Sequence, residues 1–306
     1  MAPVKDGQFL VAQRGIMTAT DTPFVTVGIG GMYDDWNAAA SDLGTTGGII
    51  IMLDSVHEIT APWEGVKLVN GVPTRANIIT RSACGKTTVR AKGGSNLRAC
   101  LCNTALTDGT ITGSGGDASK RNSGMQFWDI DFDMNYPNNA PAAIGGVQIL
   151  FSMMLDGMTN AIFENCFALN CRVATTSGTA YGIGWDTYDA YNVVMNNCGA
   201  DNCDKNLWLT TNAPGDKING RIRNFRTTNS TQEGVYFEAG VGWDIEVSGT
   251  GIGTHFIYMP TSFTSAYSGQ FRVKGKCDGF NGYGFVSHCY SGNIDLTLYN
   301  NASTTI

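Results

Sequence analysis

The chain has 306 residues, with 20 basic and 26 acidic side chains, a formal net charge of −6 and a charged fraction of only 15%. It has no run of Lys or Arg and no long apolar stretch, which argues against nucleic acid as a partner, against membrane insertion and against a Sec-type export signal. The 39 glycines and many Asn, Thr and Ser residues favour short strands and tight turns over helices.

A short phrase near the N-terminus, DGQFLVAQRG at residues 6–15, is the first motif along the chain. It is similar to the NGxFxxxQRG phrase near the start of many phage tail-fibre and virion-surface proteins, with Asp-Gly in place of Asn-Gly. The matching positions are Phe9, Gln13, Arg14 and Gly15. The resemblance implies an attachment or capping segment over residues 1–30, with Gly28 to Gly31 as its hinge, followed by one domain over residues 31–306.

The next stretch, DDWNAAASDLGTTGGIIIML at residues 34–53, predicts a short amphipathic helix and then a buried strand. Asp34 or Asp35 stands near the helix start, Ala38 to Leu43 lie inside it, and glycines end it before the apolar run. Such a helix would cover the first coil of a solenoid, whose end is otherwise an unpaired sheet edge.

Alternating segments then recur in two interleaved series. The first series comprises FWDIDFDM (127–134), NAIFENC (160–166), NVVMNNC (192–198), GRIRNF (220–225), WDIEVSG (243–249), FRVKGKC (271–277) and GNIDLTLYNN (292–301). The second comprises GVQILFS (146–152), YGIGWDT (181–187), NLWLTT (206–211), GVYFEAG (234–240), THFIYMP (254–260) and YGFVSHC (283–289). Two series that alternate along a chain predict a solenoid in which each coil gives one strand to each of two or three parallel sheets.

A repeated Asn-Cys phrase supports the solenoid. Asn165-Cys166 and Asn197-Cys198 would form the same turn in successive coils, with the Asn side chains in a hydrogen-bonded ladder and the Cys side chains in the core. Chance similarity in an Asn-rich β-sandwich is the alternative.

The helix, the Gly-Gly pair and the apolar strand within residues 34–53 resemble the start of pectate-lyase-like proteins. This family includes many phage tailspikes and polysaccharide depolymerases, and by pattern the resemblance covers residues 34–301. It implies an all-β fold, a right-handed parallel β-helix with a short N-terminal capping helix.

The first series predicts an outer face of alternating charge, because outward side chains of successive coils stack about 4.8 Å apart. One column reads Asp131, Glu164, Asn196, Arg223, Glu246, Lys274 and Asp295, and its neighbour includes Asp129, Arg221, Asp244 and Arg272. Signs that alternate between coils are typical of a solvated structural ladder. The alternative is that the acidic run DIDFD, residues 129–133, holds a cation.

The second series predicts a face of different character. One outward column reads Gln148, Gly184, Trp208, Tyr236, Ile257 and Val286, and the next reads Leu150, Asp186, Thr210, Glu238, Met259 and His288. Aromatic rings beside isolated carboxylates suit a sugar-binding surface, since rings cover pyranose C–H groups and carboxylates accept hydroxyl hydrogens. The candidate substrate-binding residues are Trp208, Tyr236, Thr210 and His288, and the candidate catalytic residues are Asp186 and Glu238.

Two coils separate Asp186 from Glu238 in this alignment, a distance of about 9 to 10 Å. Carboxyl groups about 6.5 to 9.5 Å apart leave room for water in an inverting glycosidase. This geometry permits hydrolysis without showing it, so activity stays open. A lyase would need the DIDFD carboxylates to hold calcium near Arg221 or Arg223 as base, and intervening coils separate these groups. Hydrolysis therefore ranks above lyase chemistry, and simple binding or architecture above both.

The cysteines and histidines add no catalytic grouping. Nine cysteines without an export signal favour buried, reduced thiols in a protein made in the cytoplasm. The three histidines lie far apart in sequence, and the cysteine spacings lack the second half of a zinc motif. We expect neither a metal nor a cofactor.

Together these patterns favour a phage virion-surface protein of tailspike or fibre type, a homotrimer that binds, and if active hydrolyses, a host surface polysaccharide. Its N-terminal segment would join other virion proteins. The rival hypothesis is a non-catalytic structural spike or decoration protein, whose aromatic column lies buried between subunits. A secreted bacterial depolymerase is a third hypothesis, which the missing export signal disfavours.

Overall fold

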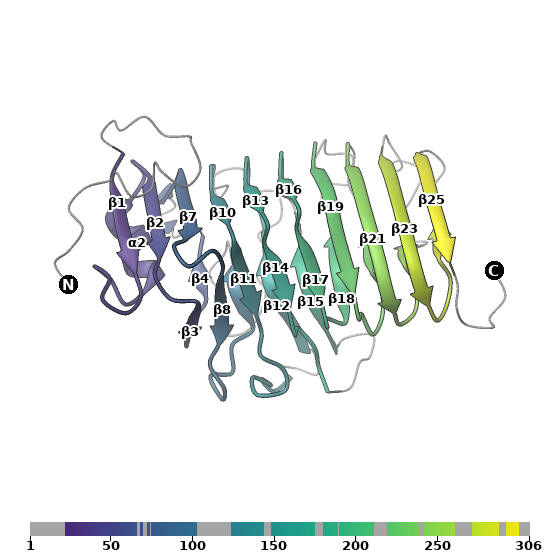
Figure 1. The fold of residues 1–306 in the computed structure, drawn as a ribbon, viewed down its shortest axis with the longest axis horizontal. Helices are drawn as coiled ribbons and strands as arrows, with labels where there is room; N and C mark the ends of the chain where they lie inside the picture. Colours follow the sequence, from purple (N-terminus) through teal and green to yellow (C-terminus); the bar gives the residue numbers. More distant parts are fainter. Residues whose placement is uncertain are drawn as a thin grey trace.

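A computed structural model describes residues 22–65, 68–69, 72–73, 75–102, 124–143, 148–174, 180–188, 190–210, 219–238, 242–260, 271–287 and 292–299. These ranges form a right-handed parallel β-helix with one short helix at its N-terminal end (Figure 1). Strand follows strand along the long axis, so that segments far apart in sequence lie side by side. The predicted fold class is confirmed.

The described residues form two parallel sheets, one small antiparallel pair and the helix. The larger sheet has 15 strands: β1 (Phe24–Val27), β2 (Gly48–Met52), β3 (Val56–Ile59), β7 (Ile78–Ser82), β8 (Thr87–Ala91), β10 (Gln126–Trp128), β11 (Ile130–Asp133), β13 (Ile162–Glu164), β14 (Phe167–Leu169), β16 (Val194–Asn196), β17 (Gly199–Asp201), β19 (Arg221–Thr228), β21 (Asp244–Ile252), β23 (Arg272–Phe280) and β25 (Asn293–Tyr299). The second sheet has eight: β4 (Trp63–Glu64), β9 (Ala99–Cys102), β12 (Gln148–Met154), β15 (Ala180–Asp186), β18 (Lys205–Leu209), β20 (Val235–Phe237), β22 (Ile257–Met259) and β24 (Phe285–Ser287). The antiparallel pair is β5 (Leu68–Val69) with β6 (Val72–Pro73).

The larger sheet changes form along the molecule. In the first coils it consists of two segments, one running through β2, β7, β10, β13 and β16, the other through β3, β8, β11, β14 and β17. Both segments pair with β19, after which β21, β23 and β25 are single long strands (Figure 1). Each early coil therefore gives three strands, and each later coil gives two, as the two interleaved series predicted.

The capping helix α2 spans Trp36–Leu43 and ends at Gly44, as expected. The Oδ2 atom of Asp35, its N-cap, accepts a hydrogen bond of 2.9 Å from the backbone of Ala38, which satisfies a free helix donor. The indole of Trp36 is fully buried and stacks on Trp63 with ring centroids 5.0 Å apart. The helix thereby closes the apolar interior at this end.

Asparagines turn the chain where the first strand segment meets the second. Asn165, Asn197 and Asn224 have φ angles between 49° and 54°, the left-handed region that Asn tolerates better than most residues. Asn165 donates from Nδ2 to Asp129 Oδ1 (2.8 Å), Asn197 to Glu164 Oε1 (2.8 Å), and Asn224 to Asn197 Oδ1 (2.9 Å). The predicted shared turn at Asn165 and Asn197 is confirmed. The hydrogen-bonded ladder differs in detail, because Asn197 donates to Glu164 and not to Asn165, and the rung between two asparagines joins Asn224 to Asn197.

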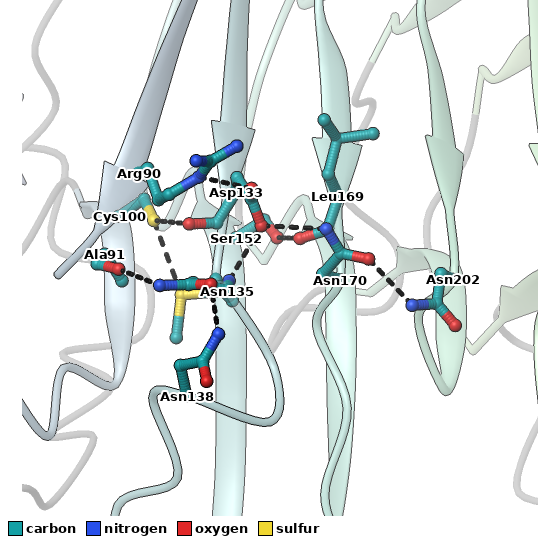
Figure 2. Close-up of polar contacts among 11 residues, drawn as sticks. Arg90, Ala91, Cys100, Asp133, Asn135, Asn138, Ser152, Leu169, Asn170 and Asn202 are labelled. Carbon is teal, nitrogen blue, oxygen red and sulfur yellow. Dashed lines mark hydrogen bonds and ion pairs between the residues drawn. The ribbon is translucent and has the colours of Figure 1, made fainter. Parts of the chain in front are cut away.

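A second ladder follows the next corner and ends on Asp133. Asn202 Nδ2 donates to Asn170 Oδ1 at 2.7 Å, and Asn170 Nδ2 donates to Asp133 Oδ1 at 3.0 Å (Figure 2). The same carboxylate accepts a 2.9 Å hydrogen bond from Arg90 Nε. Hydrogen bonds between coils at both corners fix the register of the stack.

The core is a column of apolar side chains enclosed by the sheets. Phe127 and Phe163 stack with ring centroids 5.4 Å apart, and Phe163 meets Trp185 edge-on at 5.0 Å. Cys166 and Cys198 lie buried beside them, and burial together with the hydrogen bond between the two raises the pKa of the Cys166 thiol. All eight described cysteines are free thiols.

The outer face of the larger sheet carries the charge ladder. Glu164 pairs with Asn196 and Asn196 with Arg223, and further along Glu246 pairs with Lys274 and Lys274 with Asp295. The predicted first rung of this ladder, Asp131 beside Glu164, was wrong. Trp128 is the partner of Glu164, whereas Asp131 pairs with Thr88 in the second segment. The cause is Asp129, whose φ of 60° makes it a corner that divides the segment at 127–134 into two strands.

The predicted boundary after residue 30 remains a prediction, and the phrase at residues 6–15 lies outside the described residues. β1 precedes that boundary and pairs in parallel with β2. The turn after β1 is held by hydrogen bonds from Gly28 N to Tyr33 O (3.0 Å) and from Ile29 N to Asp54 Oδ1 (3.0 Å). Within the described ranges, no helix has the length and apolar character that a membrane span requires.

Candidate functional site

The outer face of the eight-stranded sheet carries a column of aromatic side chains. The strand register pairs Asp186 with Trp208, Trp208 with Tyr236, and Tyr236 with Tyr258. Trp208 and Tyr236 have ring centroids 5.2 Å apart, and Tyr236 and Tyr258 are 5.5 Å apart. One acidic side chain and three rings therefore stand on four successive coils.

Four positions of the predicted columns face the core instead. Ile257 and Met259 are 1% and 0% exposed and belong to the core, so the outward residue of β22 is Tyr258. Leu150 is also a core residue, and a Cβ on Gly184 would meet the Cβ atoms of Ala168 and Ala200 in the core. In β15 the pairing with β12 skips Gly184, so Gly184 and Trp185 both face inward and the alternation is broken.

A cleft of about 350 Å³ opens beside the aromatic column. It is lined by Ile149, Phe151, Met154, Asp186, Tyr188, Trp208, Thr210 and Glu238. The structure thus brings together both candidate catalytic residues and two of the four candidate binding residues, Trp208 and Thr210. The eight lining residues come from four consecutive coils, because β12, β15, β18 and β20 are neighbours in the sheet.

Hydrogen bonds fix the polar groups of the cleft. The indole Nε1 of Trp208 donates to Glu238 Oε2 at 2.8 Å, and the backbone N–H of Tyr188 donates to Asp186 Oδ1 at 3.2 Å. Burial and the negative charges of Glu238 and Asp186 raise the pKa of the neighbouring Tyr181 to about 12. Both carboxylates therefore act on the same region of this face.

A buried lysine organises the rings behind the cleft. Lys205 Nζ lies 3.7 Å from the ring centroid of Tyr236, 4.8 Å from that of Tyr181 and 5.1 Å from that of Trp208. Lys205 is 8% exposed, and burial lowers the pKa of its ammonium although nearby carboxylates oppose the change. A cation held among three ring faces fixes the orientation of all three.

Glu233 is the counter-ion of this lysine. Its Oε2 lies 3.5 Å from Lys205 Nζ, and its Oε1 lies 3.7 Å from Nδ1 of His255. Burial acts to raise the pKa of Glu233, but His255 and Lys205 outweigh it and hold that pKa below the ordinary value. His255 in turn stacks on Tyr258 with ring centroids 4.8 Å apart. An ion-paired network thus runs beneath the aromatic column.

The other candidate binding residues differ in position. Tyr236 is not among the lining residues of the cleft and instead packs between Trp208 and Tyr258 over Lys205. Burial, followed by the charges of Glu238 and Glu233, raises the pKa of Tyr236. His288 lies outside the described residues.

Sequence reasoning missed Lys205, Glu233, Tyr181 and Tyr258. Lys205 and Glu233 each stand at a turn or strand start, where the alternation of apolar and polar residues does not indicate which way a side chain points. Of these four residues, Tyr258 could have been found from the sequence. In HFIYMP it stands between two aliphatic residues, a pattern that fits a half-buried strand with the tyrosine facing outward.

The acidic run at 129–133 has protein partners for each of its carboxylates. Asp129 accepts from Asn165, and Asp131 Oδ1 accepts from the backbone of Phe167 at 2.8 Å and lies 2.9 Å from Lys86 Nζ. Asp133 accepts from Arg90 and Asn170, as Figure 2 shows. Among the described residues no group of three or more His, Cys, Asp or Glu side chains is arranged to hold a metal. We therefore interpret this run as part of the corner ladders.

A larger hollow of about 620 Å³ lies over three turns near the C-terminal end. It is lined by Ser230, Thr231, Gly251, Ile252, Gly253, Gly279, Phe280 and Asn281. Gly251 takes the corner position next to Asn229, since a Cβ there would lie 3.0 Å from Asn229 Oδ1. The hollow thus opens where glycines lack a side chain, and its described lining has no titratable group.

No family model and no curated protein matches this chain. Among solved structures it is similar to the crystal structure of a pectin methylesterase from Aspergillus niger, with 12% identity and a TM-score of 0.44. That match covers 94% of this chain and 89% of the other. At this identity and TM-score the likeness carries no conclusion about activity.

Proposed function

We propose that this protein binds a polysaccharide along the outer face of the eight-stranded sheet, with the cleft beside Trp208 as its deepest subsite. The observation that carries the proposal is the hydrogen bond from the Trp208 indole to Glu238 inside a cleft that Asp186 also lines. Sugar recognition needs an apolar ring face for C–H groups and fixed acceptors for hydroxyl hydrogens, and this cleft offers both.

Two features support a preformed surface. Lys205 holds the rings of Tyr181, Trp208 and Tyr236 in one arrangement, and Glu233 neutralises that lysine. Rings that are ordered before the ligand arrives lose little side-chain entropy on binding. The aromatic column also continues to Tyr258, in the coil beyond the cleft, as an extended glycan requires.

Hydrolysis of the bound glycan is a second candidate, favoured by the placement of Asp186 and Glu238 in one cleft. In an inverting reaction one carboxyl gives its proton to the glycosidic oxygen while the other accepts a proton from the attacking water. No cofactor is needed for this chemistry. Lyase chemistry has less support, because Arg223 is ion-paired with Asp244 and the acidic run is bound to its own neighbours.

The experiment is an array of purified bacterial capsular and lipopolysaccharide glycans probed with the wild type and the Trp208→Ala variant. We expect binding to a subset of glycans and its loss in the variant, with unchanged circular dichroism. Equal binding by both proteins would refute the assignment to this cleft. Release of reducing ends from the bound glycans, abolished in Asp186→Asn and Glu238→Gln, would establish hydrolysis; its absence would leave a binding protein.

The biological setting we propose is the surface of a phage virion, after synthesis in the host cytoplasm. The resemblance of residues 6–15 to virion-surface proteins and the capped β-helix support this setting. We propose a homotrimer that is joined to other virion proteins by its N-terminal segment. Sedimentation equilibrium tests the trimer, which should have three times the 32.7 kDa mass of one chain.

The rival proposal, a structural spike with the aromatic column buried between subunits, makes a separable prediction. Under it, Tyr258→Glu would dissociate the oligomer, since a buried unpaired carboxylate is costly in a subunit interface. Under glycan binding, the same variant would keep its mass and lose affinity for the glycan.

A further inference from the structure

The charge of the cleft limits which sugars it can accept. Asp186 and Glu238 are the charged residues among its eight described lining residues, and none of the eight is Lys, Arg or His. Lys205 lies behind the rings and is paired with Glu233, so it adds no free positive charge. The remaining polar side chains in the lining are the hydroxyls of Thr210 and Tyr188.

The rest of the described lining offers no positive charge to an anion. Ile149, Phe151 and Met154 present apolar atoms, and Trp208 has already donated its indole N–H to Glu238. An anionic group placed here would lose its water and gain no cationic partner among the described lining residues. It would also lie within a few ångströms of two carboxylates, in a partly buried site where water screens repulsion poorly.

We infer that the sugar unit held in this cleft is neutral or carries a free amino group, and that uronic acids and phosphorylated sugars are excluded. The inference rests on the proposed function and adds the substrate class to it. A neutral unit uses its hydroxyls as donors to Asp186 and Glu238, while its C–H face lies against the Trp208 ring. An ammonium group gains in addition from both carboxylates and from the ring face.

The test prints each acidic polysaccharide of the array twice, in its native form and after chemical reduction of its carboxyl groups, beside neutral and amino-sugar polymers. Carboxyl reduction removes the charge and keeps the linkages. We expect the wild type to bind neutral, amino-bearing or carboxyl-reduced glycans, and to bind a reduced glycan at least about tenfold more tightly than its native form, because the carboxylates of Asp186 and Glu238 repel a nearby anion.

The outcomes separate this inference from the proposal on which it depends. If a native acidic glycan binds as tightly as its reduced form, or more tightly, the charge selection is wrong while glycan binding stands. If nothing on the array binds, the proposed function fails and the inference fails with it. If the Asp186→Asn/Glu238→Gln double variant still prefers the reduced form, the selection against charged sugars does not come from these two carboxylates.

Salt gives a second readout on the unaltered protein. Raising the NaCl concentration shortens the range of charge repulsion. The native acidic form should therefore bind more tightly as salt rises, while the affinity for its reduced form changes little. A native acidic glycan that weakens with salt would instead reveal a cationic contact, and the charge selection would be overturned.

Discussion

Trp208 and Glu238 belong to adjacent coils, 30 positions apart in sequence, and are joined by a hydrogen bond of 2.8 Å from indole to carboxylate. One side chain thus supplies the apolar wall of the cleft and also orients its acceptor. Trp208→Phe keeps an aromatic ring and removes the donor. We expect glycan affinity to fall about tenfold, or about 1.4 kcal/mol, in isothermal titration.

A matched control for that variant exists on the opposite sheet. Trp128 is also half-buried on an outer face, where Arg81 lies 4.9 Å from its ring centroid. Trp128→Phe should leave glycan affinity unchanged. A similar loss in both variants would mean that the effect is general destabilisation and not the lost bond to Glu238.

The pairing of Lys205 with Glu233 predicts a large effect on stability. Lys205→Met leaves a buried carboxylate without its counter-ion, and removing one partner of a buried pair costs on the order of 3 kcal/mol. Urea unfolding measures this loss. Lys205→Met/Glu233→Gln removes both charges and should regain most of it. If the double variant is no more stable than the single one, the ion pair is not the source of the loss.

Glu233 also predicts how stability depends on pH. Its pKa in the folded protein lies below the ordinary value because His255 and Lys205 outweigh the effect of burial. Its ionised form therefore stabilises the fold at neutral pH, and this contribution is lost as pH falls through the folded pKa. The difference in unfolding free energy between wild type and Glu233→Gln should be present at pH 7 and shrink below about pH 4.5. A difference that grows on acidification would contradict the assigned shift.

The corner ladder predicts an order among substitutions at Asn197. Its φ is 53°, and its amide both donates to Glu164 and accepts from Asn224. Asn197→Gly loses the two hydrogen bonds but keeps the backbone free of strain. Asn197→Ala loses them and adds left-handed strain, so it should be less stable than Asn197→Gly by about 1 kcal/mol. Thermal unfolding of both variants measures the difference, and equal stabilities would mean that the corner relaxes.

The general architecture was predictable because the helix-capping residues and the repeated strand segments indicated the same fold. Asp35, the alanines that follow it and Gly44 specify a capped helix without any tertiary information, and the structure places the helix there. The two interleaved series required a coil, and the Asn-Cys repeats gave the register between the two coils that carry them. In the eight-stranded sheet the predicted columns paired Gly184 with Trp208, whereas Asp186 is the partner of Trp208. Trp208, Thr210, Asp186 and Glu238 could nevertheless be assigned to one face from sequence alone.

The details of that face were harder to predict because strict alternation fails inside two strands. Ser152 and Gly184 are skipped in the pairing of β12 with β15, and in β15 the successive positions Gly184 and Trp185 both face inward. A two-residue period cannot reveal such a break. Lys205 escaped notice for another reason: a lysine is expected in solvent, and its burial is made tolerable by the ion pair with Glu233 and by three ring neighbours.

The corner asparagines make each coil an exchangeable unit of length. Asn165 bonds to the coil before it as Asn197 does, 32 positions later along the chain. A gene that duplicated residues 165–196 would add one whole coil, which includes the corner Asn165 and the strands β14, β15 and β16. Because β15 carries Asp186, the added coil would lie within the cleft and repeat part of its acidic wall. The length of this outer face could thus change in steps of one coil.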